Sequence, residues 1–295
     1  MRTVFLGTSE FAAAILRGLA STAHRPTLVI TRPDRPRGRG RRLAAPPVAG
    51  TASELGIELE QPESVNGPEA RAMIAEQRPD AVCVCAFGAL IREPLLSEHE
   101  IINVHPSLLP RWRGAAPIER AIMAGDGTTG VSIMRLTAGL DSGPVCLRRE
   151  QPIHAQDTYG TLSSRLQVVG SELLVQALDT SPAYQEQDDS AATYAEKIAA
   201  QDRVLDPARD ARQLARVVRA LTPHIGARLV LPDGTVLGIG EARAVDVPGP
   251  PPGTLALERE VPVLGCAAGA LELLAVQPPG RRMMSGADYL RGRRS

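Results

Sequence analysis

The stretch that decides the fold class is Val4-Phe5-Leu6-Gly7-Thr8-Ser9-Glu10-Phe11-Ala12-Ala13-Ala14-Ile15-Leu16. A short apolar run that stops at a glycine and leads into a longer apolar repeat predicts a strand, a tight turn and a helix. Thr8 or Ser9 is the expected cap, because a hydroxyl oxygen accepts hydrogen bonds from free N–H groups of the first helical turn. This order of strand and helix recurs further along the chain.

More predicted strands and helices alternate after this opening unit. The strands are expected at 28–31, 81–86, 101–104 and 130–136. The predicted helices include 52–55, 69–76, 117–124 and 161–178. Continuous apolar strands that alternate with helices are typical of a parallel sheet covered on both faces. We therefore expect an α/β domain with a doubly wound, Rossmann-like parallel sheet.

The last part of the chain has a different pattern. A helix is expected from Asp206 to Leu221, followed by strands 229–231 and 235–239 around the hairpin signal Pro232-Asp233-Gly234. Further short strands are expected at 254–258, 261–266 and 270–276. Several short strands separated by turns predict a small closed or partly closed β-barrel of the OB-like kind.

A polar segment, 179–190, separates the two patterns. The chain has 295 residues, and single hydrophobic cores stop growing at roughly 250–300 residues, so two domains are expected. We predict a catalytic domain over 1–189, a linker over 190–205 and a β-barrel domain over 206–295.

Composition argues against several classes of protein. The longest apolar runs fall far short of the roughly 20 residues that a membrane helix needs. Met1-Arg2 runs directly into the first strand, without the pattern of a secretion signal. The four cysteines lack the two-residue spacing of zinc ribbons and redox dithiols. They are Cys83, Cys85, Cys146 and Cys266. We expect a cytoplasmic, metal-free monomer with reduced thiols.

Two polar residues stand two apart at the end of a predicted strand, in Ile102-Asn103-Val104-His105-Pro106. Their side chains should share one face of the sheet, at the carboxyl end where ligands of open α/β sheets bind. Pro106 makes the chain leave the sheet there. A carboxylate follows in the loop Gly139-Leu140-Asp141-Ser142-Gly143-Pro144. Asn103, His105 and Asp141 are therefore the candidate catalytic residues.

An amide, an imidazole and a carboxylate suit acyl transfer to an amine. Asn103 and His105 can donate to the oxygen that becomes negative when an amine attacks a carbonyl carbon. Asp141 can orient His105 and help to move the proton from the amine to the leaving nitrogen. The pattern alone leaves structural roles open: an Asn that forms a turn, a hydrogen-bonded His and an Asp that caps a loop.

A second unusual stretch is the segment from Arg32 to Arg42, with six arginines and a single acidic residue, Asp34. Guanidinium groups pair with phosphates bidentately, so this segment is a candidate for binding a nucleic-acid backbone. The residues alone favour a solvated surface loop. Trp112 and Tyr194 are candidates for stacking on bases, with packing as the alternative for Trp112. The turn at Gly7 lacks the three-glycine fingerprint of nicotinamide cofactor sites.

The chain closely resembles the formyltetrahydrofolate-using formyltransferases in one long run and one loop. The run is Asn103-Val104-His105-Pro106-Ser107-Leu108-Leu109-Pro110-Arg111-Trp112-Arg113-Gly114-Ala115-Ala116-Pro117, and the loop is Gly139-Leu140-Asp141-Ser142-Gly143. Further motifs resemble the family members that formylate initiator Met-tRNA. They are Phe5-Leu6-Gly7-Thr8-Ser9-Glu10-Phe11, Arg32 to Leu43, Thr193-Tyr194-Ala195-Glu196-Lys197, and Gln277-Pro278-Pro279-Gly280-Arg281-Arg282-Met283-Met284-Ser285. The resemblance covers nearly the whole chain.

This resemblance implies transfer of the formyl group of 10-formyltetrahydrofolate to the α-amino group of methionine on initiator Met-tRNA, for translation initiation. It assigns catalysis to Asn103, His105 and Asp141. The folate is expected beside two segments, made of Ser107, Leu108, Leu109 and Pro110, and of Phe87, Gly88, Ala89 and Leu90. The tRNA is expected to contact Arg35, Arg37, Arg39, Arg41 and Arg42, with Arg39 as the leading candidate.

Two departures from the family pattern stand out. Pro106 takes the place of a glycine that many of these enzymes have, and the segment 222–226 lacks tryptophans seen in some relatives. Two other functions stay open. One is a formyltransferase that acts on a free small amine, such as glycinamide ribonucleotide or a nucleotide-linked amino sugar. The other is a non-catalytic tRNA-binding protein that retains the enzyme fold.

Overall fold

The computed structural model describes residues 1–37, 42–246 and 249–294, and its contacts separate into two compact units. Unit 1 comprises Met1–Pro117, Thr128–Pro152 and Ser163–Ala195. Unit 2 comprises Ile118–Gly127, Ile153–Leu162 and Glu196–Ser295. The units are discontinuous in sequence, whereas the predicted domains are continuous. The functional boundaries at 189 and 206 stay a prediction.

Unit 1 is built on a seven-stranded sheet with the order β10-β9-β7-β6-β1-β2-β5. Its strands are β1 (Thr3–Gly7), β2 (Pro26–Ile30), β5 (Glu58–Glu60), β6 (Ala81–Cys85), β7 (Ile101–His105), β9 (Thr128–Arg135) and β10 (Val145–Pro152). The ladders from β5 to β7 are parallel, while β9 runs antiparallel to β7 and β10 antiparallel to β9. The predicted α/β class is confirmed, with a mostly parallel sheet. The prediction missed β10, an edge strand whose exposed residues break the apolar pattern.

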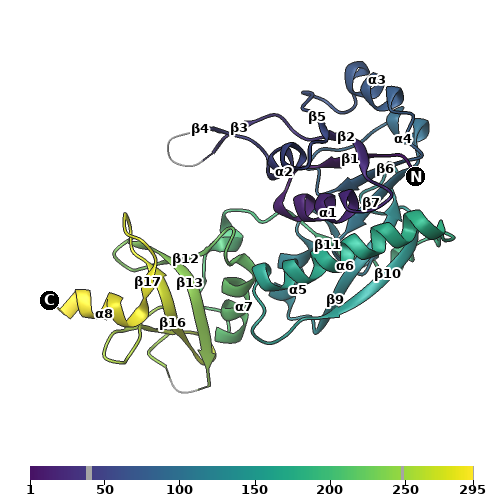
Figure 1. The fold of residues 1–295 in the computed structure, drawn as a ribbon. Helices are drawn as coiled ribbons and strands as arrows, with labels where there is room; N and C mark the ends of the chain where they lie inside the picture. Colours follow the sequence, from purple (N-terminus) through teal and green to yellow (C-terminus); the bar gives the residue numbers. More distant parts are fainter. Residues whose placement is uncertain (38–41, 247–248, 295) are drawn as a thin grey trace. The chain divides into compact units, whose positions relative to one another are not determined.

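Helices cover both faces of this sheet. They are α1 (Glu10–Ala20), α2 (Pro47–Leu55), α3 (Pro68–Glu76), α4 (Leu95–Glu98) and α6 (Tyr159–Thr180), of which unit 1 holds the part from Ser163. Figure 1 shows α1 and α6 on the same face. There a Cβ on Gly170 would lie 3.0 Å from Ile15 and 3.1 Å from Val104, so α6 packs closely on α1 and β7. Ile74 of α3 and Leu95 of α4 share another buried cluster with Ile101.

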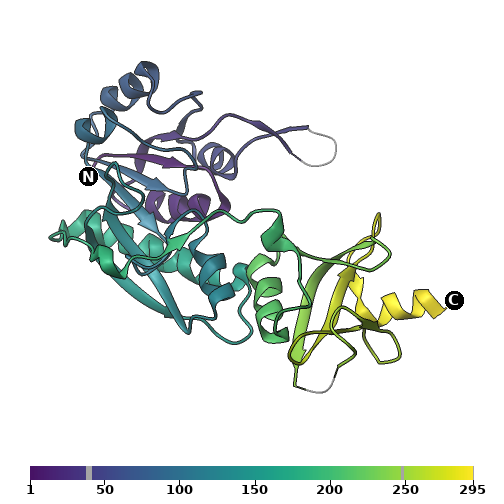
Figure 2. The same ribbon diagram turned by 180° about the vertical axis from the view of Figure 1, so that it is seen from behind.

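The predicted strand, turn and helix at the start of the chain are confirmed. Ser9 is the cap of α1, since its side-chain oxygen accepts a hydrogen bond from the Ala12 N–H at 3.2 Å. The Arg-rich segment forms a hairpin of β3 (Arg35–Arg37) and β4 (Arg42–Ala44), which extends away from the rest of unit 1 (Figures 1 and 2). Two short strands, β8 (Arg113–Gly114) and β11 (Tyr194–Ala195), pair in parallel.

Unit 2 contains the predicted antiparallel β domain. Its sheet has the order β12-β13-β16-β15-β14, with β17 paired to β16. The strands are β12 (Ala227–Val230), β13 (Val236–Val245), β14 (Leu255–Ala256), β15 (Val263–Gly265), β16 (Ala270–Gln277) and β17 (Met284–Ser285). The predicted hairpin lies between β12 and β13. The structure therefore shows an antiparallel β domain, and within the described part of the chain no ladder joins β12 to β14.

Three helices accompany this sheet: α5 (Pro117–Ala124), α7 (Ala211–Leu221) and α8 (Gly286–Arg294). The buried face of α7, including Leu214 and Val218, packs against the sheet. The prediction that α7 starts at Asp206 is wrong. Asp210 is the cap, with its carboxylate accepting from the Arg212 N–H at 2.6 Å, while Asp206 closes a separate turn.

None of the helices in the described ranges is long and apolar enough to cross a membrane. The four cysteines are free thiols. Burial raises the pKa of the Cys83 thiol to about 12. That thiol stays protonated at neutral pH, so it is a poor nucleophile. Among the described residues no group of three or more His, Cys, Asp or Glu side chains stands close enough to hold a metal ion.

Candidate active site

Asn103 and His105 lie on β7 and close to its carboxyl end, as predicted. Successive side chains of a strand point to opposite faces, so these two share a face with Ile101, while Val104 faces α6. Asn103 is 8% exposed and His105 is 4% exposed. The Asn103 amide has no hydrogen-bond partner among the residues that the structure describes. It is therefore free to donate to a ligand.

The His105 ring is held at one nitrogen and open at the other. Its Nε2 lies 2.9 Å from the carbonyl oxygen of Trp112, which can only accept a hydrogen bond. Nε2 therefore carries a proton, and in the neutral ring Nδ1 carries the lone pair. Nδ1 lies 3.7 Å from Oδ2 of Asp141. The ring can take up a proton at Nδ1 and form an ion pair with the carboxylate.

Asp141 sits in the loop between β9 and β10, with a positive φ of 45°. Its Oδ2 accepts a hydrogen bond from the Gly114 N–H at 2.8 Å. This bond helps to fix the carboxylate, whose side chain is only 14% exposed. The structure thus brings His105 and Asp141 together and places Asn103 on the same strand face.

Gly114 shows why the motif has a glycine at this position. Its φ is 122°, and a Cβ there would lie 2.7 Å from the carbonyl oxygen of Ala195. Residues 193–195 run beside 113–114, and the N–H groups of Arg113 and Ala115 donate to this segment. This role was not predicted, because residues 190–205 were expected to form a linker. Only the family motif Thr193-Tyr194-Ala195-Glu196-Lys197 could have pointed to it.

Comparisons with known proteins cover nearly the whole chain. The family model described as formyl transferase covers residues 1–178, and the model of the formyl transferase C-terminal domain covers 197–294. A methionyl-tRNA formyltransferase of Methylococcus capsulatus is 44% identical over 297 residues, which are 98% of this chain and 96% of the relative. The chain belongs to the methionyl-tRNA formyltransferase family. A second member, from Halorhodospira halophila, is 42% identical and covers 99% of this chain and 96% of its own length.

A solved structure gives the same fold at much lower identity. It is WlaRD, described as a sugar 3N-formyl transferase in the presence of dTDP and 5-N-formyl-THF. The TM-score is 0.67 at 14% identity, over 96% of this chain and 99% of that chain. Formyltransferases with different substrates therefore share this architecture, so the fold alone does not decide between methionyl-tRNA formyltransferases and relatives with small substrates.

The first segment predicted to bind folate in this family member is rigid. Ser107 is fully buried, and its hydroxyl donates to the Arg111 carbonyl at 2.6 Å. Ser132 ties the segment to β9, donating to the Ser107 carbonyl at 2.7 Å and accepting from the Leu109 N–H at 3.1 Å. Leu109 packs in a buried cluster. Leu108 and Pro110 are partly exposed.

The second predicted folate segment is more open. Phe87 is buried, and its carbonyl accepts from the Thr8 hydroxyl at 2.7 Å. Gly88 and Ala89 are exposed, and Leu90 is 64% exposed. Side chains from outside the segment hold its backbone: Arg32 donates to the Gly88 carbonyl, and Asn66 donates to the Leu90 carbonyl at 2.8 Å. An apolar side chain on a held backbone suits packing against a flat ring.

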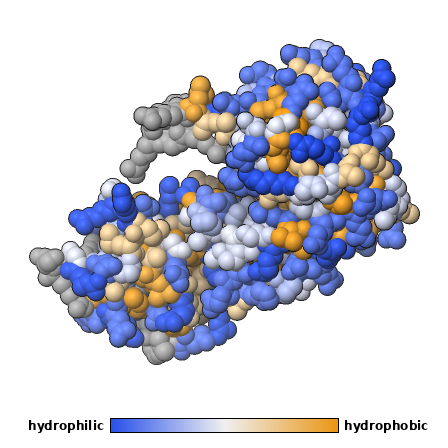
Figure 3. All heavy atoms as spheres, in the orientation of Figure 1, coloured by the Kyte–Doolittle hydropathy of each residue, from blue (hydrophilic) through white to orange (hydrophobic). Residues whose placement is uncertain are grey.

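The described part of the predicted tRNA segment lies in the β3–β4 ladder. Arg35 is exposed, and Arg39 and Arg41 lie outside the described residues. Arg37 and Arg42 face each other in the ladder, without described side chains. Apolar colour is visible on the described part of the hairpin in Figure 3, where Leu43 is 71% exposed.

The two aromatic candidates differ in exposure. Tyr194 is 58% exposed, whereas Trp112 is half-buried and has the Arg111 guanidinium 4.5 Å from its ring centroid. Its φ of 63° is in the left-handed region, next to the carbonyl that holds His105. Tyr194 is thus the more accessible candidate for stacking, while Trp112 has a structural task at the site.

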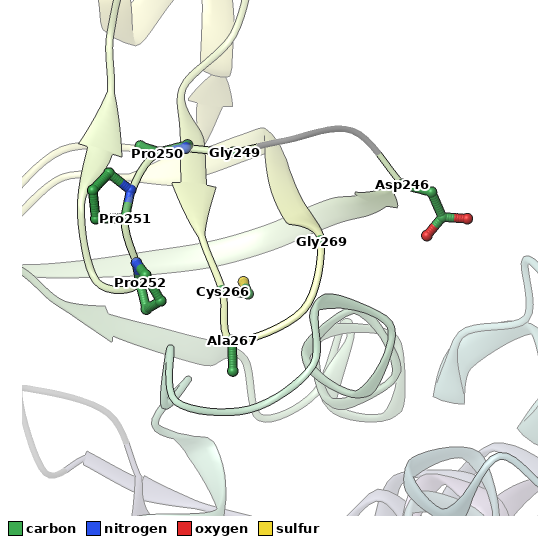
Figure 4. Close-up of a pocket in the computed structure, with 8 residues that line it drawn as sticks. All are labelled: Asp246, Gly249, Pro250, Pro251, Pro252, Cys266, Ala267 and Gly269. Carbon is green, nitrogen blue, oxygen red and sulfur yellow. The ribbon is translucent and has the colours of Figure 1, made fainter.

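Unit 2 has a pocket of about 630 Å³ that contains none of the predicted site residues. Its lining is Asp246, Gly249, Pro250, Pro251, Pro252, Cys266, Ala267 and Gly269. In Figure 4, Pro250, Pro251 and Pro252 lie apart from Asp246. The Asp246 carboxylate pairs with Arg212 at 2.5 Å. The pocket therefore offers few polar groups that converge on one point.

Proposed function

We propose that this protein transfers the formyl group of 10-formyltetrahydrofolate to the α-amino group of methionine on initiator Met-tRNA. The product, formylmethionyl-tRNA, serves translation initiation. The observation that carries the proposal is the His105–Asp141 pair, 3.7 Å apart beside Asn103, in a chain 44% identical to a methionyl-tRNA formyltransferase over nearly its full length. The pair can transfer the proton, and membership of the family indicates the substrates.

His105 is the proposed base. The amine nitrogen attacks the formyl carbon and forms the new C–N bond, while its proton passes to the Nδ1 lone pair of His105. The imidazolium that results is stabilised by the Asp141 carboxylate at 3.7 Å. The same proton then goes to the leaving nitrogen of the folate as its bond to the formyl carbon breaks. Both transfers use Nδ1, because Nε2 is hydrogen-bonded to the Trp112 carbonyl.

Asn103 is the proposed oxyanion donor. In the tetrahedral intermediate the former carbonyl oxygen is negative, and a donor that is already in place stabilises it without reorganisation. The Asn103 amide is available for this role, since it is 8% exposed and makes no hydrogen bond with another described residue. Protonated His105 can add a second donor from Nδ1.

The substrate contacts stay proposals. For the folate we propose Ser107, Leu108, Leu109, Pro110, Phe87, Gly88, Ala89 and Leu90; the exposure of Leu90 and the partial exposure of Leu108 and Pro110 support ring packing there. For the tRNA we propose Arg35, Arg37, Arg39, Arg41 and Arg42, supported by the hairpin that presents this segment. We also propose that the protein is cytoplasmic and monomeric. Size-exclusion chromatography with light scattering tests the oligomeric state.

Parallel assays with different acceptor substrates separate the possible functions. Purified protein receives 10-formyltetrahydrofolate with charged initiator tRNA, free methionine, glycinamide ribonucleotide or a dTDP-linked amino sugar in parallel. We expect formylmethionyl-tRNA on an acid gel and no formylation of the free amines. Formylation of a free amine without product on tRNA would reassign the protein to the small-substrate branch. Binding of tRNA without any formyl transfer would make it a non-catalytic binding protein.

A further inference from the structure

Gln187 connects the catalytic loop to a buried arginine. Its Nε2 donates to two backbone carbonyls, those of Asp141 at 2.8 Å and Gly143 at 2.7 Å. Its Oε1 accepts from Nε of Arg113 at 3.1 Å. Gln187 belongs to the polar segment that the sequence analysis assigned to the domain boundary, yet all three polar contacts face the site.

Arg113 is the fixed point of this connection. It is 3% exposed, and its guanidinium also pairs with Asp189 at 2.7 Å. Burying a guanidinium is costly unless it is paired and hydrogen-bonded, so Arg113 has one low-energy arrangement. The backbone beside it is equally fixed, because the next residue, Gly114, donates to the Asp141 carboxylate at 2.8 Å.

Asp141 is therefore held from two sides through neighbouring residues. Gly114 binds its carboxylate, and Gln187 binds its main-chain carbonyl. A φ of 45° is uncommon for residues other than glycine, although aspartate adopts this region more readily than most. The Gln187 bonds to both sides of Ser142 hold the loop in this conformation.

We propose that Gln187 is a positioning residue for formyl transfer, which fixes the Asp141 loop so that the carboxylate stays at Nδ1 of His105. The inference rests on the proposed function. Gln187 acts through Asp141 and touches neither substrate. Its loss lowers the rate of the chemical step and leaves substrate binding unchanged. A purely structural Gln187 would instead affect stability alone.

The test variant is Gln187→Glu, which keeps the acceptor for Arg113 and replaces the donor to the two carbonyls by a repelling oxygen. We expect kcat to fall by up to about 100-fold, the effect of a displacement of about 1 Å, with KM for both substrates unchanged. The matched control is Gln176→Glu, the same substitution at an exposed position on α6, which should keep kcat. Where Gln187→Glu does not fold, Gln187→Met replaces it.

A double-mutant cycle with Asp141→Asn decides the mechanism, measured in single turnovers with excess enzyme. If Gln187 acts through Asp141, Gln187→Glu has little further effect on the Asp141→Asn enzyme. Equal losses in both backgrounds, a normal kcat in the single variant, or a changed KM with normal kcat each overturn the proposal. Because the wild type is assayed alongside, an inactive wild type indicates failure of the proposed function, and an active wild type with a fully active variant indicates failure of this inference alone.

Discussion

The carboxyl end of β7 and the β3–β4 hairpin are built in opposite ways. At the end of β7, His105 is 4% exposed, and both it and Asp141 are fixed by hydrogen bonds to backbone groups. The hairpin is two short strands joined by one ladder, with Arg35 exposed and Leu43 71% exposed. One region is set before any substrate arrives, and the other presents side chains to solvent.

This contrast separates rate from recognition. Groups that stabilise a transition state are most effective when they are already oriented and partly desolvated. Groups that pair with a large, charged partner are effective at the surface, where the energy of each contact is small and depends on salt. Substitutions at the end of β7 should therefore change kcat, and substitutions on the hairpin should change affinity for tRNA.

The largest expected effect comes from Asp141→Asn. The amide keeps the size of the side chain but cannot stabilise an imidazolium at His105, so kcat should fall by several orders of magnitude. KM should change little, and the melting temperature should stay near that of the wild type. Single-turnover rates with charged tRNA measure the loss. Turnover close to normal would remove Asp141 from the mechanism and break the contrast between the two regions.

Asn103→Ala should have the next largest effect. Removal of one oxyanion donor typically costs about 10²–10³ in rate. The loss should appear in kcat, because the donor acts only when the oxygen becomes negative. A variant that instead binds folate weakly and turns over normally would make Asn103 a substrate-binding residue.

Sequence reasoning reached the strand-end site because its signals are local. Two polar residues of the same parity before Pro106 fix both the face and the edge of the sheet, and the structure agrees. The hydrogen bonds that Gln187 makes to the Asp141 loop could not be predicted, because Gln187 lies 46 positions after Asp141 and carries no periodic or capping signal. The edge strand β10 was missed because its exposed and partly exposed residues interrupt the apolar pattern.

The hairpin shows the reverse limitation. Its arginines were evident from composition. The pairing of Arg35 with Ala44 depends on backbone hydrogen bonds, which the sequence of a charged segment with few apolar residues does not predict. Likewise the start of α7 was placed at Asp206, because Asp206-Pro207 has the pattern of a helix start, whereas the cap is Asp210, four residues later. Local chemistry predicts which residues can act, and tertiary contacts select among them.

Gly114→Ala should have an intermediate effect on both stability and rate. With φ at 122° and a Cβ 2.7 Å from the Ala195 carbonyl, strands β8 and β11 must shift apart. The strain should lower the free energy of unfolding by about 1–3 kcal/mol, and the shift should weaken the bond to Asp141 and reduce kcat. The control is Gly50→Ala in α2, where nothing lies within 4 Å of the new Cβ and a small gain in stability is expected. Equal stability of the two variants would contradict the close contact.

Arg35→Ala should have the smallest effect and sharpen the comparison most. Arg35 is exposed at the base of the hairpin, so its loss leaves the fold and the kcat at saturating tRNA unchanged. If it pairs with phosphate, the KM for tRNA rises, and the slope of log affinity against log salt falls by roughly 0.7–0.9. The matched control is Arg17→Ala on α1, where the arginine pairs with Glu54 and the net charge changes equally. A slope that changes as much in Arg17→Ala would reflect overall charge, and an unchanged slope in Arg35→Ala would mean that this arginine does not touch phosphate.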